Sequence, residues 1–433
     1  MSNNSNRSEQ EELDNFIDLY NQKKFETIVK SIEFFIKKFP NNFHAKNIFA
    51  LTLKSQGRFE ESKKIFLEVI NNNLRNPKIA YIYTNTGNLY YDLGQVDQAI
   101  TFHKASIQLD PKSINSYLGL GLGFSNQGDN EKAVQAFNRG IEIDKNNQNL
   151  LYNLATSLRK LERYKEAAGC YSKTINPLSK SYQLECLYLD LENDTSYEEF
   201  NHFLNKINLE NNYNPLIASI NTHSSIRFEK ENKCNFCKKP FDFIKKEKLF
   251  ENERFNEDLI NKVLKDFESS NISRKTQSLL NKGFQSSGNI FNLESKAIQQ
   301  LKKIIEVKIS DYRKFYQDSN EGFIKNWPKN YTIYGWLIIM NEGGNLSSHI
   351  HKEGWLSSSI YLKRPTKIKK NDGDIKFSLH GGNYESDKKE FPEKIINIDQ
   401  GDMVMFPSSI FHSTIPFDLN EQRITLAFDI LPK

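Results

Sequence analysis

Two hydrophobic patterns divide the chain. Up to about residue 176, and again in the segments 256–267 and 294–316, apolar residues recur at intervals of three and four. This spacing places them on one face of a helix and predicts amphipathic helices. The segment 282–293, between the last two helices, is rich in Gly, Ser and Asn and is predicted to be a loop.

From Tyr331 onward the pattern predicts strands instead. Short runs of alternating or β-branched residues are separated by Gly, Asn, Asp and Pro, as expected for strands joined by turns. The runs are residues 331–340, 356–365, 374–381, 394–400, 402–408 and 423–431. Six strands in so short a segment predict an antiparallel sandwich or jelly roll, with the two preceding helices packed on its outside.

The helical half repeats itself with a period of 34 residues. Small residues recur at two positions of the repeat: Gly87, Gly121 and Ala155 at one, and Ala99, Ala133 and Ala167 at the other. We interpret most of these as points where two antiparallel helices touch and only a small side chain lets the backbones approach. A further unit contains Gly57, Phe59, Ser62 and Phe66, and a weaker one ends on Pro40.

This pattern resembles the tetratricopeptide family over about residues 9–176, in some five units of which three are clear. The alternative interpretation is an irregular helical bundle in which the 34-residue spacing is accidental. The resemblance implies a curved solenoid whose concave face commonly holds peptides or proteins. We therefore expect a protein or peptide ligand on that face, with a dimerisation or docking element for the rest of the chain as the alternative role.

Composition narrows the classes of function. The net charge of +5 is small for 433 residues and no segment concentrates Lys and Arg, which argues against a dedicated nucleic-acid binder. No apolar run reaches the roughly 18 residues of a membrane helix, and residues 1–15 lack the apolar centre of a signal peptide. Four cysteines are too few for a disulfide scaffold. We expect a cytoplasmic protein that binds neither nucleic acid nor membrane.

Residues 178–250 are predicted to form a helical cap and a connector. Cys234 and Cys237 have the C-x-x-C spacing of half a zinc knuckle or a redox pair. No second pair with knuckle spacing follows, and a structural zinc site normally needs four ligands. We interpret the segment as a connector whose aromatic residues pack against the next domain.

Half of the eight histidines lie in the strand-rich segment. His349 and His351 are two residues apart, a spacing that points both side chains to the same face of a strand. His412 follows a later run, and Arg423 and Thr425 share a face of the last one. Histidines on one side of a sheet, followed by an inward arginine, suggest a metal site with an anion site beside it.

These residues stand in three motifs: H-x-H followed by G-W-L-S-x-x-I-Y-L, then G-D-x-V-x-F-P-S-x-x-x-H, then R-I-x-x-A-F. In this order they resemble the prolyl-hydroxylase-like branch of the 2-oxoglutarate-dependent oxygenases, over about residues 284–432. The resemblance implies a double-stranded β-helix in which three side chains hold Fe(II) and leave positions open for 2-oxoglutarate and O₂. It also implies that Arg423, with Thr425 beside it, pairs with the distal carboxylate of 2-oxoglutarate. Tyr361 is either a hydrogen-bond partner of 2-oxoglutarate or an ordinary strand aromatic.

One feature departs from the family pattern. Most members have H-x-D or H-x-E where this chain has His349-Ile350-His351. Iron is then held either by His349, His351 and His412, or by His351, Glu353 and His412. We favour the first set, because the spacing from His349 to Tyr361 suits a short turn between the ligand strand and its partner.

Other polar and aromatic residues have weaker assignments. Two histidines on a strand can also be surface residues, and His412 a core histidine. Asn341 and Trp355 are candidates for the substrate mouth, although Trp355 fits core packing equally well. His380 stands in a glycine-rich turn and is expected to be exposed.

We thus expect an α + β multidomain protein, with a tail at residues 1–8, a repeat array at 9–177, the cap and connector at 178–250, and an oxygenase domain at 251–433 whose β-core begins near 331. The expected activity is Fe(II)- and 2-oxoglutarate-dependent hydroxylation of a peptide, protein or other substrate presented with help of the array. One alternative is a binding module with an inactive jelly roll. Another is a cupin-like enzyme without 2-oxoglutarate, against which Arg423 argues.

Overall fold

The computed structural model describes residues 8–74, 76–192, 194–210, 213–249, 253–270, 274–275 and 277–433. It consists of two compact units, Met1–Ser179 and Lys180–Lys433, which are considered separately. The expected tail lies outside the described residues except for Ser8, which forms a capping box with Glu11 at the start of the first helix.

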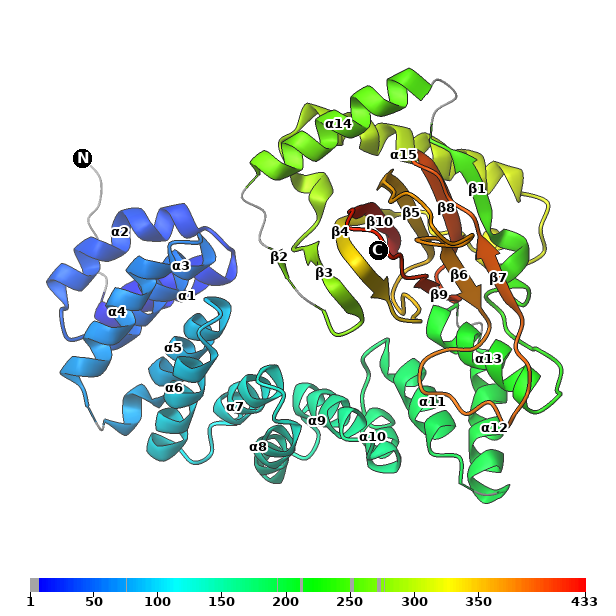
Figure 1. The fold of residues 1–433 in the computed structure, drawn as a ribbon. Coiled ribbons are helices and arrows are strands. Elements are labelled where there is room, and N and C mark those ends of the chain that lie inside the picture. Colours follow the sequence, from blue (N-terminus) through cyan, green and yellow to red (C-terminus); the bar gives the residue numbers. More distant parts are fainter. Residues whose placement is uncertain are drawn as a thin grey trace. The chain divides into compact units, whose positions relative to one another are not determined.

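The first unit is built from consecutive antiparallel helices (blue to cyan in Figure 1) and confirms the tetratricopeptide-type array. The helices are α1 (Glu9–Asn21), α2 (Phe25–Lys38), α3 (Phe43–Ser55), α4 (Phe59–Asn72), α5 (Ala80–Asp92), α6 (Val96–Leu109), α7 (Ile114–Asn126), α8 (Asn130–Ile143), α9 (Gln148–Lys160) and α10 (Tyr164–Tyr171), with a 3₁₀ turn, η1 (Pro77–Ile79), before α5.

Small residues lie where the helices touch. A Cβ atom on Gly121 would lie 2.3 Å from the Phe137 ring, far inside van der Waals contact. Gly87 and Gly119 both face the buried imidazole of His103, at 2.7 and 2.3 Å from a built Cβ. The small residues of the repeat therefore lie at close helix contacts, as predicted from the sequence.

The second unit begins with three helices that we call the cap: α11 (Ser179–Leu189), α12 (Asp194–Leu209) and α13 (Pro215–Arg227). Their apolar residues form one buried cluster that includes Tyr384 and Phe411 of the β-domain. A connector follows, with the 3₁₀ turn η2 (Pro240–Phe243).

The β-domain consists of two antiparallel sheets, as expected for a jelly roll. The major sheet has the order β1-β8-β5-β10-β4-β3-β2 and the minor sheet the order β7-β6-β9. The strands are β1 (Lys245–Lys248), β2 (Arg274–Lys275), β3 (Leu280–Ser286), β4 (Tyr331–Leu346), β5 (Leu356–Lys363), β6 (Ile375–Ser378), β7 (Glu393–Ile396), β8 (Asp402–Pro407), β9 (Phe411–Thr414) and β10 (Arg423–Pro432).

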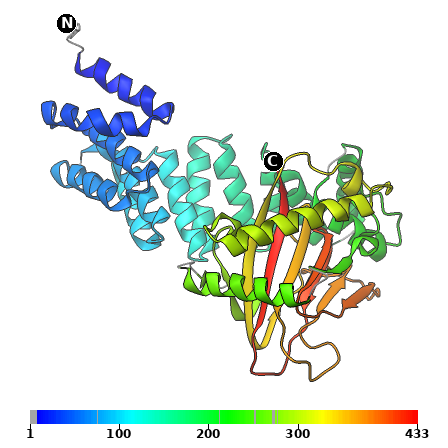
Figure 2. The same cartoon turned by 90° about the horizontal axis from the view of Figure 1, so that it is seen from above.

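The central strands of the major sheet have two different faces. On β10, Ile424, Leu426 and Phe428 join a core with the helices α14 (Glu253–Ser269) and α15 (Lys296–Phe315). Figure 2 shows these two helices lying across the outer side of the sheet. The alternate residues Arg423 and Thr425 face the space between the sheets. Both helices match the predicted segments. The shorter helices η3 (Ile290–Asn292) and α16 (Gly322–Lys325) precede β4.

Parts of the sheets differ from the sequence expectation. The predicted loop 282–293 is wrong in its first part, because residues up to Ser286 form β3 and pair with β4. Gly283 lies so close to β4 that a Cβ atom would meet the carbonyl oxygen of Ile339 at 2.4 Å, so a glycine that suggested a loop instead permits a close strand contact. Strand β1 pairs with β8, although it precedes residue 251.

Candidate metal and cosubstrate site

The two histidine-bearing segments are joined by backbone hydrogen bonds. The His349 amide donates to the His412 carbonyl at 3.1 Å, and the His412 amide donates back at 3.0 Å. The His351 amide donates to the Ser408 carbonyl at 3.1 Å. The segment after β4 therefore extends the minor sheet beside β9, and this pairing brings together side chains more than 60 positions apart in the sequence.

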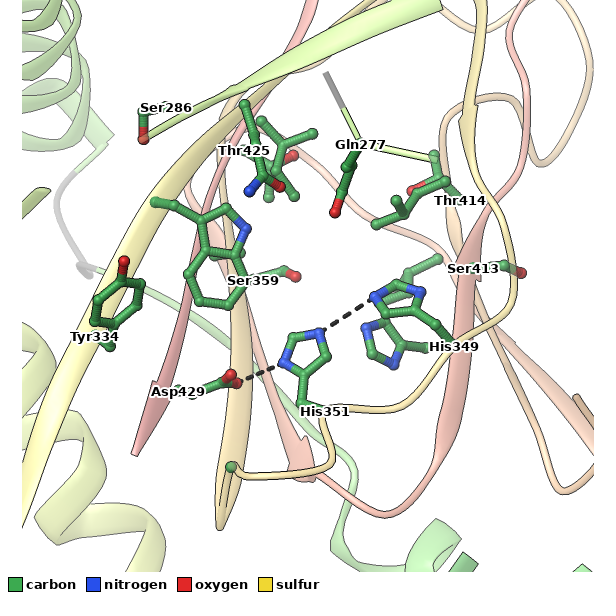
Figure 3. A pocket seen from close by; sticks show the side chains of 18 of the residues that line it. Gln277, Ser286, Tyr334, His349, His351, Ser359, Ser413, Thr414, Thr425 and Asp429 are labelled. Carbon is green, nitrogen blue, oxygen red and sulfur yellow. Dashed lines mark hydrogen bonds and ion pairs between the residues drawn. The ribbon is translucent and has the colours of Figure 1, made fainter. Parts of the chain in front are cut away.

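The three imidazoles converge at one point. One ring nitrogen from each of His349, His351 and His412 lies within 4.8 Å of the others, and the Nε2 atoms of His349 and His351 are 3.2 Å apart. Figure 3 shows these two rings side by side in the pocket. Within the described part of the chain, this is the one group of three or more His, Cys, Asp or Glu side chains arranged to hold a metal ion.

An oxygen atom lies beside the Nδ1 atom of each ring. The distances are 2.8 Å from His349 to the Ser347 carbonyl, 3.2 Å from His412 to the Ile410 carbonyl, and 2.6 Å from His351 to Asp429 Oδ1. Because these oxygens accept hydrogen bonds, each Nδ1 carries the ring proton. The Nε2 lone pairs are left facing the centre, which is the tautomer that metal binding requires.

Asp429 is a site residue that the sequence reasoning missed. Its Oδ1 accepts hydrogen bonds from His351 and from the Ser357 hydroxyl, the latter at 2.7 Å, and Ser357 also bonds Ser408 at 2.7 Å. A signal was present, because Asp429 is separated from Arg423 by an even number of residues on β10 and so shares its inward face. A carboxylate behind a ligating imidazole fixes the ring orientation and increases its basicity.

Burial keeps two of the imidazoles neutral. It lowers the pKa of His349 to about 4, with the neighbouring His351 acting in the same direction. Burial lowers the pKa of His412 well below its ordinary value, and the other two histidines add to this effect. Neutral imidazoles are the metal-binding form, so these rings need lose no proton to bind a cation at neutral pH.

Arg423 lies at one end of the same cavity and is only 2% exposed. Its Nε donates to the Gly373 carbonyl at 3.0 Å and its Nη1 to Thr425 Oγ1 at 2.9 Å. It forms no ion pair within the described residues; burial lowers the pKa of the guanidinium, and Tyr361 and the charge of Asp374 act in the opposite direction. A buried cation without a counter-charge is costly, so this end of the cavity is suited to an anion.

Tyr361 adds a second unsatisfied group. The guanidinium carbon of Arg423 lies 5.0 Å from the centre of the Tyr361 ring. The buried Tyr361 hydroxyl makes no hydrogen bond of ordinary geometry within the described structure, although Ser359 and Arg423 lie near it. Burial raises the pKa of this phenol to about 12, which keeps it protonated and able to donate. A buried donor without an acceptor is unfavourable, and a carboxylate bound at Arg423 is an acceptor of the right kind.

The histidines and Arg423 line one cavity of about 520 Å³. It is of the size that holds a small-molecule ligand. Besides these residues its walls include Tyr334, Trp336, Ile338, Met340, Ser359, Ser413, Thr414, Thr425 and Asp429. The Trp336 ring centre lies 5.6 Å from that of His351. The aromatic residues Tyr334 and Trp336 were not identified from the sequence.

The other residues that the sequence suggested for the site do not belong to the histidine group. Glu353 is exposed at the cavity wall and is not part of the histidine group. Asn341 is exposed and accepts a hydrogen bond from Gln422, while the Trp355 indole is buried and donates to the Phe323 carbonyl at 2.9 Å. Neither Asn341 nor Trp355 lines the cavity.

His380 is half-buried rather than exposed, because its Nδ1 lies 2.8 Å from Nε2 of the buried His223 on α13. Cys234 and Cys237 are buried free thiols, and Cys234 Sγ accepts a hydrogen bond from the Phe236 amide at 3.3 Å. In the described residues no further metal-binding side chain joins this pair.

The donor set fits a divalent iron ion with an organic dianion beside it. Imidazole is a good ligand for Fe(II), Zn(II) and Cu(II) alike, so the three rings alone do not select the metal. Two imidazole nitrogens that hold one ion at neighbouring positions lie about 3 Å apart, close to the separation of 3.2 Å found here. Arg423 and the Tyr361 hydroxyl form an end of the cavity that suits a carboxylate.

Family comparisons agree with this geometry. The model described as "Putative 2OG-Fe(II) oxygenase" matches residues 334–429, and models described as "TPR repeat" and "Tetratricopeptide repeat" match residues 87–128 and 114–147. Among the described residues, no helix has both the length and the apolar character to cross a membrane.

Curated relatives match part of the chain only. The small glutamine-rich tetratricopeptide repeat-containing protein 2 of Mycosarcoma maydis is 33% identical over 86 residues, or 20% of this chain and 24% of the relative. The Hsp70-Hsp90 organizing protein of Triticum aestivum is 29% identical over 108 residues, or 25% of this chain and 18% of the relative. This chain therefore spans about a quarter or less of either relative.

Solved structures show similarly limited likeness. The pilF protein of Pseudomonas aeruginosa is 13% identical with a TM-score of 0.40, covering 47% of this chain and 91% of that one. A tetratricopeptide repeat protein of Parabacteroides merdae is 13% identical with a TM-score of 0.38, covering 69% and 99%. These scores are low and carry no weight for function.

From the family models and the fold, the chain combines tetratricopeptide repeats with a C-terminal domain of the 2-oxoglutarate- and Fe(II)-dependent oxygenase family.

Proposed function

We propose that the protein is a 2-oxoglutarate-dependent dioxygenase that hydroxylates its substrate. The observation that carries this proposal is the pairing, within one cavity, of three convergent imidazoles with a buried arginine that forms no ion pair among the described residues. In this proposal His349, His351 and His412 hold Fe(II). Arg423, Tyr361 and Thr425 bind the distal carboxylate of 2-oxoglutarate.

The bound iron would supply oxidation of a C–H bond by O₂, coupled to conversion of 2-oxoglutarate to succinate and CO₂. The protein supplies orientation. Asp429 and Ser357 hold His351 in the Nδ1-protonated form, and Arg423 with Thr425 sets the direction of the cosubstrate. The apolar walls Ile338 and Met340 limit water at the Arg423 end, which strengthens the charge pairing there.

A peptide or protein is the substrate class we propose. Two relatives of the repeat array are named for protein-directed roles, the Hsp70-Hsp90 organizing protein of Triticum aestivum and the peroxisomal targeting signal receptor of Saccharomyces cerevisiae. Repeat arrays of this fold present long concave surfaces suited to extended chains. In the proposal, the array recruits the partner that the second unit oxidises.

A second function is favoured by the ligand set itself. The histidine group contains no carboxylate, whereas most of the family has one. An inactive jelly roll attached to a protein-binding array would tolerate this loss. Succinate formation from 2-oxoglutarate with Fe(II), O₂ and no prime substrate distinguishes the two functions, since the inactive alternative forms none.

Substitutions test the ligand assignment. His412→Ala should lose most Fe(II) after anaerobic loading, because two remaining imidazoles bind weakly, while His202→Ala on the exposed face of α12 should keep the ion. His349→Ala should behave like His412→Ala, and Glu353→Ala should retain iron and turnover within a small factor. Loss of iron in Glu353→Ala with retention in His349→Ala would move the site to His351, Glu353 and His412.

A further inference from the structure

The segment that carries two of the proposed ligands has a second face outside the cavity. His349 and His351 line the cavity, while Ile350 between them packs against the apolar cluster of the cap. The same arrangement occurs on β9, where Phe411 belongs to that cluster and His412 faces the cavity. The cap helices α11–α13 therefore support both ligand-bearing segments from behind (Figure 1).

An ion pair with a buried carboxylate and a partly exposed ammonium connects the cap to the end of the ligand segment. Lys352, the residue after His351, lies with its Nζ atom 2.7 Å from Glu185 Oε1 on α11. Glu185 is only 5% exposed and also accepts a hydrogen bond from the Tyr384 hydroxyl at 3.4 Å. The Lys352 ammonium lies 5.4 Å from the centre of the Tyr182 ring, another cap residue. Removing one member of a buried pair leaves an uncompensated charge, so the contact holds Lys352 in one place.

Within the β-domain His351 is held by its ring and its backbone. Asp429 and Ser357 hold the ring, the Ser408 carbonyl accepts from the amide, and the His351 carbonyl accepts from the Gly354 amide at 3.2 Å. The chain then turns through Lys352 and the exposed Glu353 to reach β5. The Lys352 ammonium attaches this turn to the cap by an ion pair, beside the apolar contact of Ile350 with the cap cluster. A ligand histidine whose following residue is free to move would sample orientations in which its Nε2 leaves the common centre.

We propose that Glu185 is a positioning residue for the metal centre, acting through Lys352 to hold His351 in its ligating orientation. The inference rests on the proposed function, since it concerns the same metal site. It assigns a role in metal binding to a helix outside the β-sandwich. Glu185 touches neither metal nor substrate in this proposal. Its contribution is the orientation of the chain next to a ligand.

The test is the affinity of the metal-free full-length protein for Mn(II), measured by electron paramagnetic resonance titration without turnover. Glu185→Gln keeps the shape of the side chain and removes its charge, and we expect Mn(II) binding to weaken about tenfold, as for outer-shell partners of metal ligands. The matched control is Glu229→Gln. That exposed carboxylate pairs with Lys389, also between the cap end and the β-domain, and does not contact the ligand segment. It should bind Mn(II) as the native protein does.

A double-mutant cycle separates positioning from general support of the fold. If Glu185 acts through Lys352, then Lys352→Met weakens Mn(II) binding by a similar factor, and the double variant is no weaker than the worse single variant. Additive losses would mean that Glu185 supports the site by a route that does not involve Lys352, and would overturn the proposal. Should Glu185→Gln fail to fold, Lys352→Met alone decides, because native Mn(II) affinity in that variant excludes the mechanism.

The result that would contradict the proposed metal site differs from the result that would contradict the role of Glu185. Retention of Mn(II) by His412→Ala would refute the metal site itself. Loss of Mn(II) in His412→Ala, with native affinity in both Glu185→Gln and Lys352→Met, would leave the site intact and refute only the role of Glu185.

Discussion

The roles of individual cavity residues follow from the charges that they balance and the groups that they orient. Arg423 is the clearest case, because a buried guanidinium is stabilised by an anion in direct contact and Arg423 forms no ion pair with a described residue. Its inward direction was predictable, since Arg423 and Thr425 alternate on one strand with the apolar residues of the outer core. The unsatisfied Tyr361 hydroxyl was not predictable, because it depends on which atoms surround a buried ring in three dimensions.

Arg423→Leu should weaken 2-oxoglutarate binding by roughly 2–5 kcal/mol, the range for removing one member of a buried charge pair, and should spare metal binding. Tyr361→Phe should cost about 1 kcal/mol, the net contribution of one hydrogen bond. Calorimetric titration of 2-oxoglutarate into the Mn(II)-loaded variants measures both. An unchanged dissociation constant in Arg423→Leu would mean that the arginine has a structural role.

At the level of elements, periodicity predicted most helices and strands but not their local exceptions. The segment 282–293 was misread because Gly and Ser are frequent in loops, whereas here Gly283 permits close contact between β3 and β4. The proposed ligands His349 and His351 lie beyond the end of β4, and the pairing of His349 with His412 of β9 is a long-range contact. A single sequence shows the alternation within a strand, but it does not show which distant strand will lie beside it.

The helices of the repeat array contain a pH-sensitive contact. His103 of α6 is enclosed by Gly87 and Gly119, and burial lowers its pKa to about 4. The unfolded chain binds a proton at this residue below about pH 6.5, whereas the folded array does not. Stability should therefore fall as the pH drops from about 6.5 to about 4, at up to about 1.4 kcal/mol per pH unit.

Urea unfolding of the full-length chain at several pH values measures this effect. His103→Leu cannot take up the proton and should show a shallower loss of stability over that pH range than the native protein. Equal slopes for the two proteins would show that His103 is protonated in the folded state.

On the scale of the whole molecule, the compact unit that contains the β-domain also contains the cap and β1. The second unit begins at Lys180 and contains the cap cluster with Phe411. Strand β1 pairs with β8, and its residues Lys246 and Lys248 lie 2.9 and 2.8 Å from the fully buried carboxylate of Asp402. Sequence patterns locate elements, but the elements that share a core become visible only when contacts are known.

Two fragments should therefore behave differently. Residues 180–433 should fold cooperatively and bind Mn(II) close to the affinity of the full chain. Residues 251–433 should not, because without β1 the buried Asp402 carboxylate loses both of its partly exposed lysine partners, and the cap no longer covers Ile350 and Phe411. A third fragment, 230–433, keeps β1 and removes only the cap, so it should fold less stably and bind Mn(II) more weakly than 180–433. Thermal unfolding and Mn(II) titration of the three fragments measure their stability and their metal affinity. Native-like Mn(II) affinity in residues 251–433 would show that neither the cap nor β1 is needed to form the metal centre.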